Sequence, residues 1–204
     1  AIVNVNDAPT GSVTVTGTVS EDGELTANAS ALADADGLGT LSYQWKAGGA
    51  NIDGATSSTY TLTQQEVGKT VTVSVSYTDG EGTSESVLSL ASAVVSNVND
   101  APTGSVTVTG TATQGGTLTA DTSALADADG LGAFSYQWKA GGVDIDGATS
   151  STYTLTQEEV GKTATATVSY TDGEGTLETV TSAAIPVVNE NPAFDIELLS
   201  TSGA

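Results

Sequence analysis

Acidic and amide side chains recur in three short segments, and each segment is present twice in the chain. The three pairs are Asn6-Asp7 with Asn99-Asp100, Asp34-Ala35-Asp36 with Asp127-Ala128-Asp129, and Asp79-Gly80-Glu81 with Asp172-Gly173-Glu174. Carboxylate and amide oxygens are the ligands that calcium prefers in proteins. The chain has no Cys, His or Met, so the nitrogen and sulfur donors that select zinc or copper are missing. These residue types therefore favour calcium.

The same segments also fit roles that need no metal. Asp-Gly and Asn-Asp stretches cap turns through local side-chain hydrogen bonds, and acidic residues keep a protein soluble. The Asp34-x-Asp36-Gly37 stretch does not continue as an EF-hand, because its twelfth position is Trp45 and not a bidentate Glu. Paired carboxylates could act as acid and base on a glycoside. Outside a shaped apolar pocket they more often bind metal, and we predict no enzyme activity.

The charge of the chain limits its partners. It has 25 acidic residues, four lysines and no arginine, for a net charge of -21. No basic cluster could neutralise the phosphates of a nucleic acid or of an anionic membrane. No apolar run is long enough to insert into a bilayer. Without cysteine, no disulfide can stabilise the fold. Cations are the natural partners of such a chain.

The sequence is an internal duplication. Residues 5–95 align with residues 98–188 at an offset of 93 without a gap, and about three quarters of the positions are identical. A period of this length corresponds to one small domain. We predict domains at residues 1–97 and 98–190, followed at 191–204 by a tail or the start of a different domain. The chain opens without an initiating Met or a signal peptide, so we expect a fragment of a longer protein.

Each copy has the pattern of an all-β domain. Short segments rich in Val, Thr, Tyr and Ser alternate with Gly, Asp and Asn clusters, which is typical of strands joined by tight turns. Leu41, Tyr43 and Trp45 share one face of a segment, as do the alternate residues from Val71 to Tyr77, so both faces are predicted to be core. The strands expected in the first copy are 12–16, 24–27, 41–47, 58–63, 70–78 and 84–95, with a short edge near 51–52 and one helical turn at 64–68.

A Trp on the third strand, here Trp45 and Trp138, is typical of immunoglobulin-like β-sandwiches. These two residues could instead stack on sugars, but their inward phase with Tyr43 and Tyr136 favours core packing. In such a sandwich the B–C loop, the F–G loop and the start of strand A lie at the same end. The three acidic segments of one copy would therefore meet, and like charges gathered there require a cation.

Several stretches in combination resemble the extender repeats of giant repeats-in-toxin adhesins of Gram-negative bacteria. They are Asn-Val-Asn-Asp-Ala-Pro-Thr-Gly, Ser-Ala-Leu-Ala-Asp-Ala-Asp-Gly-Leu-Gly, Ser-Tyr-Gln-Trp and Val-Ser-Tyr-Thr-Asp-Gly-Glu-Gly-Thr. The resemblance covers both copies. It implies immunoglobulin-like or cadherin-like sandwiches, repeated many times, that project a ligand-binding tip from the cell surface with calcium stiffening the linkers. The glycine-rich calcium nonapeptides that give the family its name are absent.

The stretch Asn97-Val98-Asn99-Asp100 also looks like a cadherin linker, in which Asn and Asp bind calcium together with an Asp-x-Asp loop of the next domain. By this resemblance Asp127 and Asp129 form that loop, and Asp172 closes the site. Glu21 and Glu66 would reach it from the first repeat, although Glu21 becomes Gln114 in the second copy. The complete set of predicted metal ligands is Asn6, Asp7, Glu21, Asp34, Asp36, Glu66, Asp79, Asn97, Asn99, Asp100, Asp127, Asp129, Glu159 and Asp172.

We therefore expect two tandem immunoglobulin-like (cadherin-like) extender modules, extracellular and on a bacterial surface. They would form a monomeric, elongated array whose partners are neighbouring repeats of the same polypeptide, with calcium (Ca²⁺) stiffening each linker and a distal region serving cell adhesion or biofilm formation. The alternative is a repeat that itself binds carbohydrate or protein, as a module of a secreted protein or hydrolase. The copies share their acidic loops and differ mainly at 19–24, 28–29, 50–51 and the last strand, which suits a spacer better.

Overall fold

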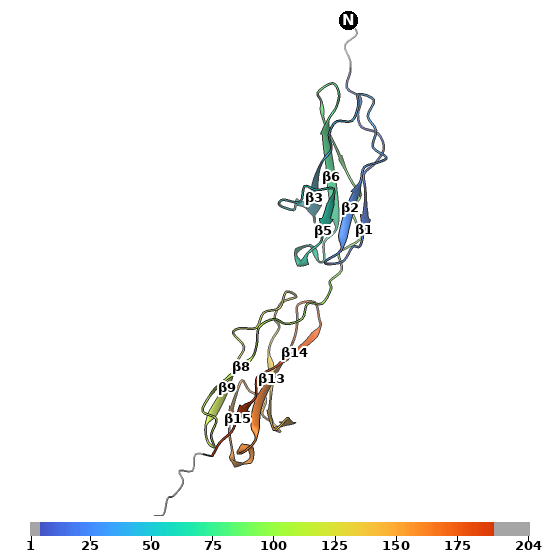
Figure 1. Ribbon diagram of the computed structural model, residues 1–204. Helices are drawn as coiled ribbons and strands as arrows, with labels where there is room; N and C mark the ends of the chain where they lie inside the picture. Colours follow the sequence, from blue (N-terminus) through green and yellow to red (C-terminus); the bar gives the residue numbers. More distant parts are fainter. Residues whose placement is uncertain (1–4, 190–204) are drawn as a thin grey trace, which may run out of the picture. The chain divides into compact units, whose positions relative to one another are not determined.

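The chain folds as two compact units, residues 1–99 and 100–204, in a computed structural model that describes residues 5–189 (Figure 1). The division follows Asn99, whereas the boundary expected from the repeat follows Asn97. The expected tail at 191–204 lies outside the described residues. The two units are called module 1 and module 2 below, and each is described by itself.

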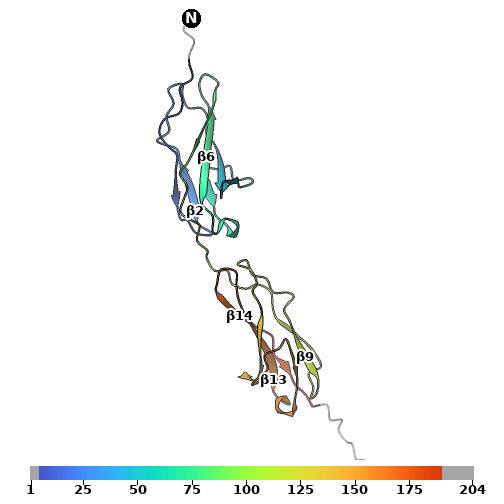
Figure 2. The ribbon, with the colours of Figure 1, turned by 180° about the vertical axis from the view of Figure 1, so that it is seen from behind.

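Module 1 consists of two antiparallel sheets. The smaller sheet has the order β1 (Thr14–Gly17), β2 (Glu24–Asn28) and β5 (Thr59–Thr61). The larger has the order β4 (Ala50–Asn51), β3 (Ser42–Ala47), β6 (Val71–Thr78) and β7 (Ser84–Leu88). Placing strands one, two and five against three, four, six and seven is the arrangement of an immunoglobulin-like sandwich. Figure 2 shows β2 and β6 in the two layers.

Module 2 repeats this topology. Its smaller sheet has the order β8 (Thr107–Gly110), β9 (Thr117–Asp121) and β12 (Thr152–Thr154). Its larger sheet has the order β11 (Val143–Asp144), β10 (Ser135–Ala140), β13 (Thr163–Thr171) and β14 (Leu177–Thr181), and β15 (Ile185–Pro186) pairs with β13. The all-β tandem sandwich predicted from the sequence is confirmed.

The core of each module forms around its Trp. Trp45 is fully buried, and its indole N–H donates to the carbonyl of Ser57 at 2.9 Å, so its one polar group is satisfied. Trp138 repeats this bond with Ser150 at 2.9 Å. Every second residue of β6, from Val71 to Tyr77, is buried, as the alternation predicted. Leu41 and Tyr43, predicted to face the core with Trp45, are half-buried and pack against it.

The predicted strand at 84–95 is wrong in extent, because β7 ends at Leu88. Beyond that point serine hydroxyls replace backbone partners. Ser89 Oγ accepts from the N–H of Val73 at 3.0 Å, and Ser92 Oγ accepts from the N–H of Val71 at 2.9 Å. Such side-chain bonds compete with a regular ladder and let the chain leave it. The predicted helical turn is present as the 3-10 helix η1 (Gln64–Glu66), with η2 (Gln157–Glu159) in module 2.

Candidate metal centre at the acidic loops

The turn after the long strand is organised by one carboxylate oxygen in each module. Asp79 Oδ1 accepts hydrogen bonds from the N–H groups of Glu81 at 3.0 Å and Thr83 at 2.7 Å. Asp172 Oδ1 makes the same two bonds, at 2.9 and 2.8 Å. An Asp in this position closes a turn by taking two backbone donors. One oxygen of each side chain is therefore committed to the turn.

The loop before the third strand is held by the first Asp of its Asp-x-Asp stretch. Asp34 Oδ1 accepts from the N–H of Asp36 at 2.9 Å, and Asp34 Oδ2 accepts from the hydroxyl of Tyr77 at 2.6 Å. In module 2, Asp127 is bonded in the same way by the N–H of Asp129 and by the hydroxyl of Tyr170. This carboxylate thus links the loop to the core-facing side of the long strand.

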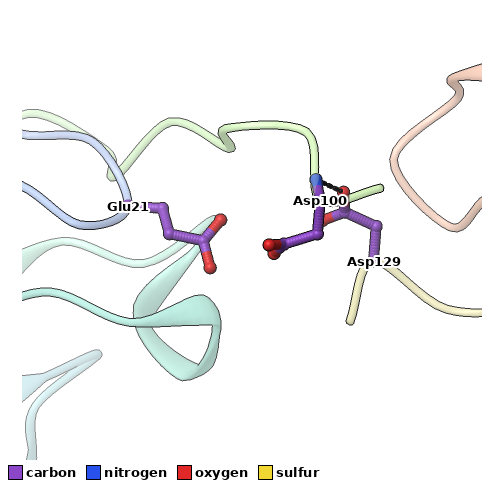
Figure 3. A group of neighbouring side chains, drawn as sticks. All are labelled: Glu21, Asp100 and Asp129. Atoms are coloured by element: carbon purple, nitrogen blue, oxygen red, sulfur yellow. Dashed lines mark hydrogen bonds between the residues drawn. The ribbon is translucent and has the colours of Figure 1, made fainter. Parts of the chain in front are cut away.

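The second Asp of the stretch holds a residue at the start of each module. The N–H of Asp7 donates to Asp36 Oδ2 at 2.7 Å. The N–H of Asp100 donates to Asp129 Oδ2 at 2.8 Å, the bond drawn as a dashed line in Figure 3. The start of the module and the Asp-x-Asp loop are therefore in direct contact in both copies.

Glycine lets the third acidic segment join the other two. The N–H of Gly80 donates to the carbonyl of Asp36 at 3.0 Å, and the N–H of Gly173 donates to the carbonyl of Asp129 at 2.9 Å. A Cβ at either glycine would lie 2.5 Å from that carbonyl oxygen, so no larger residue fits. The structure thus brings the three acidic segments of one module together. In module 1 this acidic cluster comprises Asp7, Asp34, Asp36 and Asp79, and in module 2 it comprises Asp100, Asp127, Asp129 and Asp172.

Each cluster contains a buried carboxylate oxygen that has no hydrogen-bond partner. Asp79 and Asp172 are both 6% exposed, and the Oδ2 atom of each is buried and unpartnered. Asp129 Oδ1 is in the same condition. Leaving a buried charged oxygen unsatisfied is expensive, which is why buried carboxylates are normally paired or bind metal. The lysines do not supply this pairing, because Lys46 and Lys139 lie beside β4 and β11, and Lys69 and Lys162 follow η1 and η2.

The tyrosine hydroxyls respond to the charge of the clusters. Burial, the hydrogen bond to Asp34, and the charges of Asp34, Glu85 and Asp79 all raise the pKa of Tyr77. Burial, the bond to Asp127, and the charges of Asp127, Glu178 and Asp172 raise the pKa of Tyr170 in the same way. Both phenols therefore remain protonated donors beside the carboxylates. These tyrosines were not among the predicted site residues, although each is the last core-facing residue of its strand.

Glu66 and Glu159 have a folding role that was not predicted from the sequence. Glu66 Oε2 accepts from the N–H of Thr63 at 3.0 Å, the hydroxyl of Thr63 at 2.9 Å and the hydroxyl of Tyr60 at 3.2 Å. Glu159 closes the equivalent capping box with Thr156. The Thr-x-x-Glu spacing is the sequence signal of this motif. A metal-binding role for either Glu stays a prediction.

The amides and the remaining Glu lie around the linkers. Asn6 Nδ2 donates to Glu85 Oε1 at 2.7 Å, which adds an unpredicted acidic residue to the surroundings of the first cluster. Glu21 Oε2 accepts from the N–H of Val98 at 3.4 Å. Asn97 Oδ1 is buried without a hydrogen-bond partner, and Asn99 is exposed.

Comparisons with known proteins concern the fold. No protein-family model matches the sequence, and no curated protein does. Titin domains A168–A170 match 88% of the chain at 14% sequence identity with a TM-score of 0.32. Three N-terminal domains of the bacteriophage RB49 outer capsid protein Hoc match 85% of the chain at 18% identity, also with a TM-score of 0.32. The fibronectin(III)-like modules of Clostridium thermocellum CbhA match 87% of the chain at 14% sequence identity with a TM-score of 0.28, and the match covers 94% of their own length.

The chain spans 60% and 59% of the titin and Hoc structures. At these identities and TM-scores the matches carry no argument about function, and the strand order is what defines the fold. No helix in residues 5–189 has the length and hydropathy to cross a membrane. The chain is thus an all-β protein made of two tandem immunoglobulin-like β-sandwich modules, each with an acidic cluster formed by three separate segments.

Proposed function

We propose that the chain is a pair of calcium-binding spacer modules from an extracellular bacterial surface adhesin. Each acidic cluster would bind Ca²⁺, and neighbouring modules of the same polypeptide would form an array that holds a distal adhesive region away from the cell. Catalysis is not part of this role.

The observation that carries the proposal is the unpartnered Oδ2 atom of Asp79 and of Asp172. In both modules this oxygen is buried and accepts no hydrogen bond, and the turn that contains it contacts the Asp-x-Asp loop. A cation would supply the missing partner and neutralise the like charges around it. All the side-chain atoms of the cluster that could bind a metal are carboxylate oxygens, which are the ligands that calcium prefers. In module 2, Asp100, Asp129 and Asp172 would hold the ion, and Asp127 would complete its surroundings.

A calcium ion in the module 2 cluster would also act on the linker backbone. The N–H of Val98 is bound by Glu21 of module 1, and the N–H of Asp100 is bound by Asp129 of module 2. Calcium on Asp129 and Asp100 would strengthen the second of these attachments and so restrict the backbone of the linker. A ligand that binds only the ordered state stabilises it by about 2.7 kcal/mol at a hundredfold excess over Kd. Extracellular modules often bind calcium with Kd of roughly 10⁻⁴ to 10⁻³ M.

The outer faces suit a spacer better than a binding surface. Threonines occupy most of the outward positions of the small sheets, and in module 2 the hydroxyls of Thr117 and Thr154 lie 3.1 Å apart across two strands. The larger sheet of module 2 repeats this with Thr167 and Thr181, also at 3.1 Å. Hydroxyl groups that bond one another offer few features for a specific partner. A glycan array probed with the intact chain separates the two roles, since a strong specific signal would favour the carbohydrate-binding alternative.

The direct test is calcium titration of the two-module chain by calorimetry, with small-angle X-ray scattering in calcium and in chelator. We expect about one calcium site in each module, with the weak affinity typical of extracellular sites, and a larger maximum dimension in calcium. The Asp127→Asn, Asp129→Asn double variant should lose the module 2 site. Asp53→Asn with Asp146→Asn is the matched control, since both residues are exposed turn acids. A wild-type chain that binds no calcium refutes the proposal.

A further inference from the structure

We propose that Tyr77 and Tyr170 are positioning residues for the calcium clusters, each orienting the first carboxylate of its Asp-x-Asp loop. This inference rests on the proposed calcium-binding function and adds a second layer to the site. The supporting contacts are the hydroxyl of Tyr77 on Asp34 Oδ2 at 2.6 Å and the equivalent bond from Tyr170 to Asp127 at 2.5 Å.

The core determines where each hydroxyl lies. Tyr77 continues the buried series of alternate residues on β6 and is 4% exposed, while Tyr170 ends the same series on β13 and is 2% exposed. In module 2 the ring of Phe134 contacts that of Tyr170 edge to face, with centroids 5.6 Å apart. The phenol ring therefore has little freedom, and its hydroxyl leaves the core at the acidic cluster.

The hydroxyl completes the restraint of a carboxylate. Asp127 Oδ1 is already held by the N–H of Asp129 at 2.9 Å. With Tyr170 on Oδ2, both oxygens have one donor, so the plane of the carboxylate is set before a cation arrives. Each oxygen keeps a second lone pair that can still bind a cation. Outer hydrogen bonds of this kind fix ligand geometry, and removing them typically lowers metal affinity by roughly 10- to 100-fold.

The same bond connects the site to the fold. Because the ring is packed in the hydrophobic core, ordering of the cluster and packing of the sandwich share one side chain. Calcium binding should therefore be reported by the near-ultraviolet spectrum of the buried tyrosines.

The test compares two double variants of the whole chain. Tyr77→Phe with Tyr170→Phe removes only the two hydroxyls that reach the clusters, and Tyr43→Phe with Tyr136→Phe removes two from half-buried neighbours on β3 and β10. Calorimetry with calcium alone should show affinity lowered by roughly 10- to 100-fold in the first variant and unchanged in the second. Far-ultraviolet circular dichroism checks that both are folded.

A double-mutant cycle with Asp34→Asn and Asp127→Asn distinguishes a positioning role of the two tyrosines from a purely structural one. If the tyrosines act through these carboxylates, adding the Phe substitutions to the Asn variant lowers calcium affinity no further. Wild-type protein and the Tyr43, Tyr136 control should also show a tyrosine difference spectrum that saturates with the calorimetric signal. Equal affinity in the Tyr77, Tyr170 variant, or no difference spectrum in wild-type protein that binds calcium, overturns the inference alone. A wild-type chain without calcium binding overturns the proposed function and the inference together.

Discussion

Replacing Asp79 and Asp172 by Asn separates the metal site from the turn that contains it. Asn keeps an Oδ1 acceptor for the two backbone N–H groups that lie 2.7 to 3.0 Å from the Asp oxygen, so the turn is preserved. The substitution removes the charge on the buried, unpartnered Oδ2. An unsatisfied buried polar group costs about 1–3 kcal/mol, and more when it is charged. Relief of this cost should offset the weaker bonds of a neutral acceptor.

In chelator we therefore expect the free energy of unfolding of the variant to equal that of wild type within about 1 kcal/mol. In calcium at a hundredfold excess over Kd, wild type should gain about 2.7 kcal/mol per bound site, and the variant should lose most of this gain. For a domain of this size, 1 kcal/mol corresponds to a shift in Tm of about 4–8 °C.

The assay is urea denaturation and calorimetric melting in both conditions, with Asp53→Asn and Asp146→Asn as the control for loss of charge. The variant contradicts our reasoning if its metal-free stability falls by roughly 2 kcal/mol or more while the full calcium increment remains. In that case the two Asp residues form turns and do not bind metal.

Three further predictions concern the fold. Trp45→Ala should lower the free energy of unfolding of module 1 by about 3–5 kcal/mol in urea denaturation, and a loss below roughly 1 kcal/mol would show that Trp45 is not a core residue. Gly132→Ala should strongly destabilise module 2, since its Cβ would lie 1.9 Å from the carbonyl oxygen of Thr171. Gly142→Ala, where the Cβ would lie in open space, should lower the free energy of unfolding by only about 1–2 kcal/mol. Equal melting shifts of the two variants would contradict this prediction. Burial, the charge of Glu66 and its hydrogen bond raise the pKa of Tyr60 to about 12, so this phenol ionises at lower pH in the unfolded chain than in the folded one. Its contribution to stability is therefore complete below pH about 10 and is lost as pH rises through about 12. Tyr60→Phe should flatten this alkaline loss of stability, and an unchanged loss in the variant would show that the bond to Glu66 is unimportant.

Several features of the fold could be predicted because they are local. Alternation along Val71 to Tyr77 indicates a strand with one buried face, and the Asp-Gly pairs indicate turns. The end of the last strand could not be predicted, because it depends on Ser89 and Ser92 meeting backbone groups of β6. The serines do not reveal in sequence whether they face water or replace a ladder partner.

The candidate site could likewise be predicted from the sequence only in part. Residue types alone indicated oxygen ligands for calcium, and the repeat indicated that they occur twice. The roles of individual oxygens depend on neighbours about 30 to 45 positions away in the chain, such as Tyr77 on Asp34 and Asp7 on Asp36. No local pattern distinguishes the oxygen of Asp79 that closes a turn from the one that is left unpartnered.

The sequence by itself therefore determined the duplication, the all-β class and the oxygen chemistry of the acidic segments, since these follow from identity, periodicity and composition. Only the tertiary structure decided which carboxylates are already satisfied and which are buried without a partner. The reason is physical: hydrogen bonds and burial are properties of atoms brought together by the two sheets, and in each module the sandwich joins the three segments at one end through the close approach of Gly80 or Gly173.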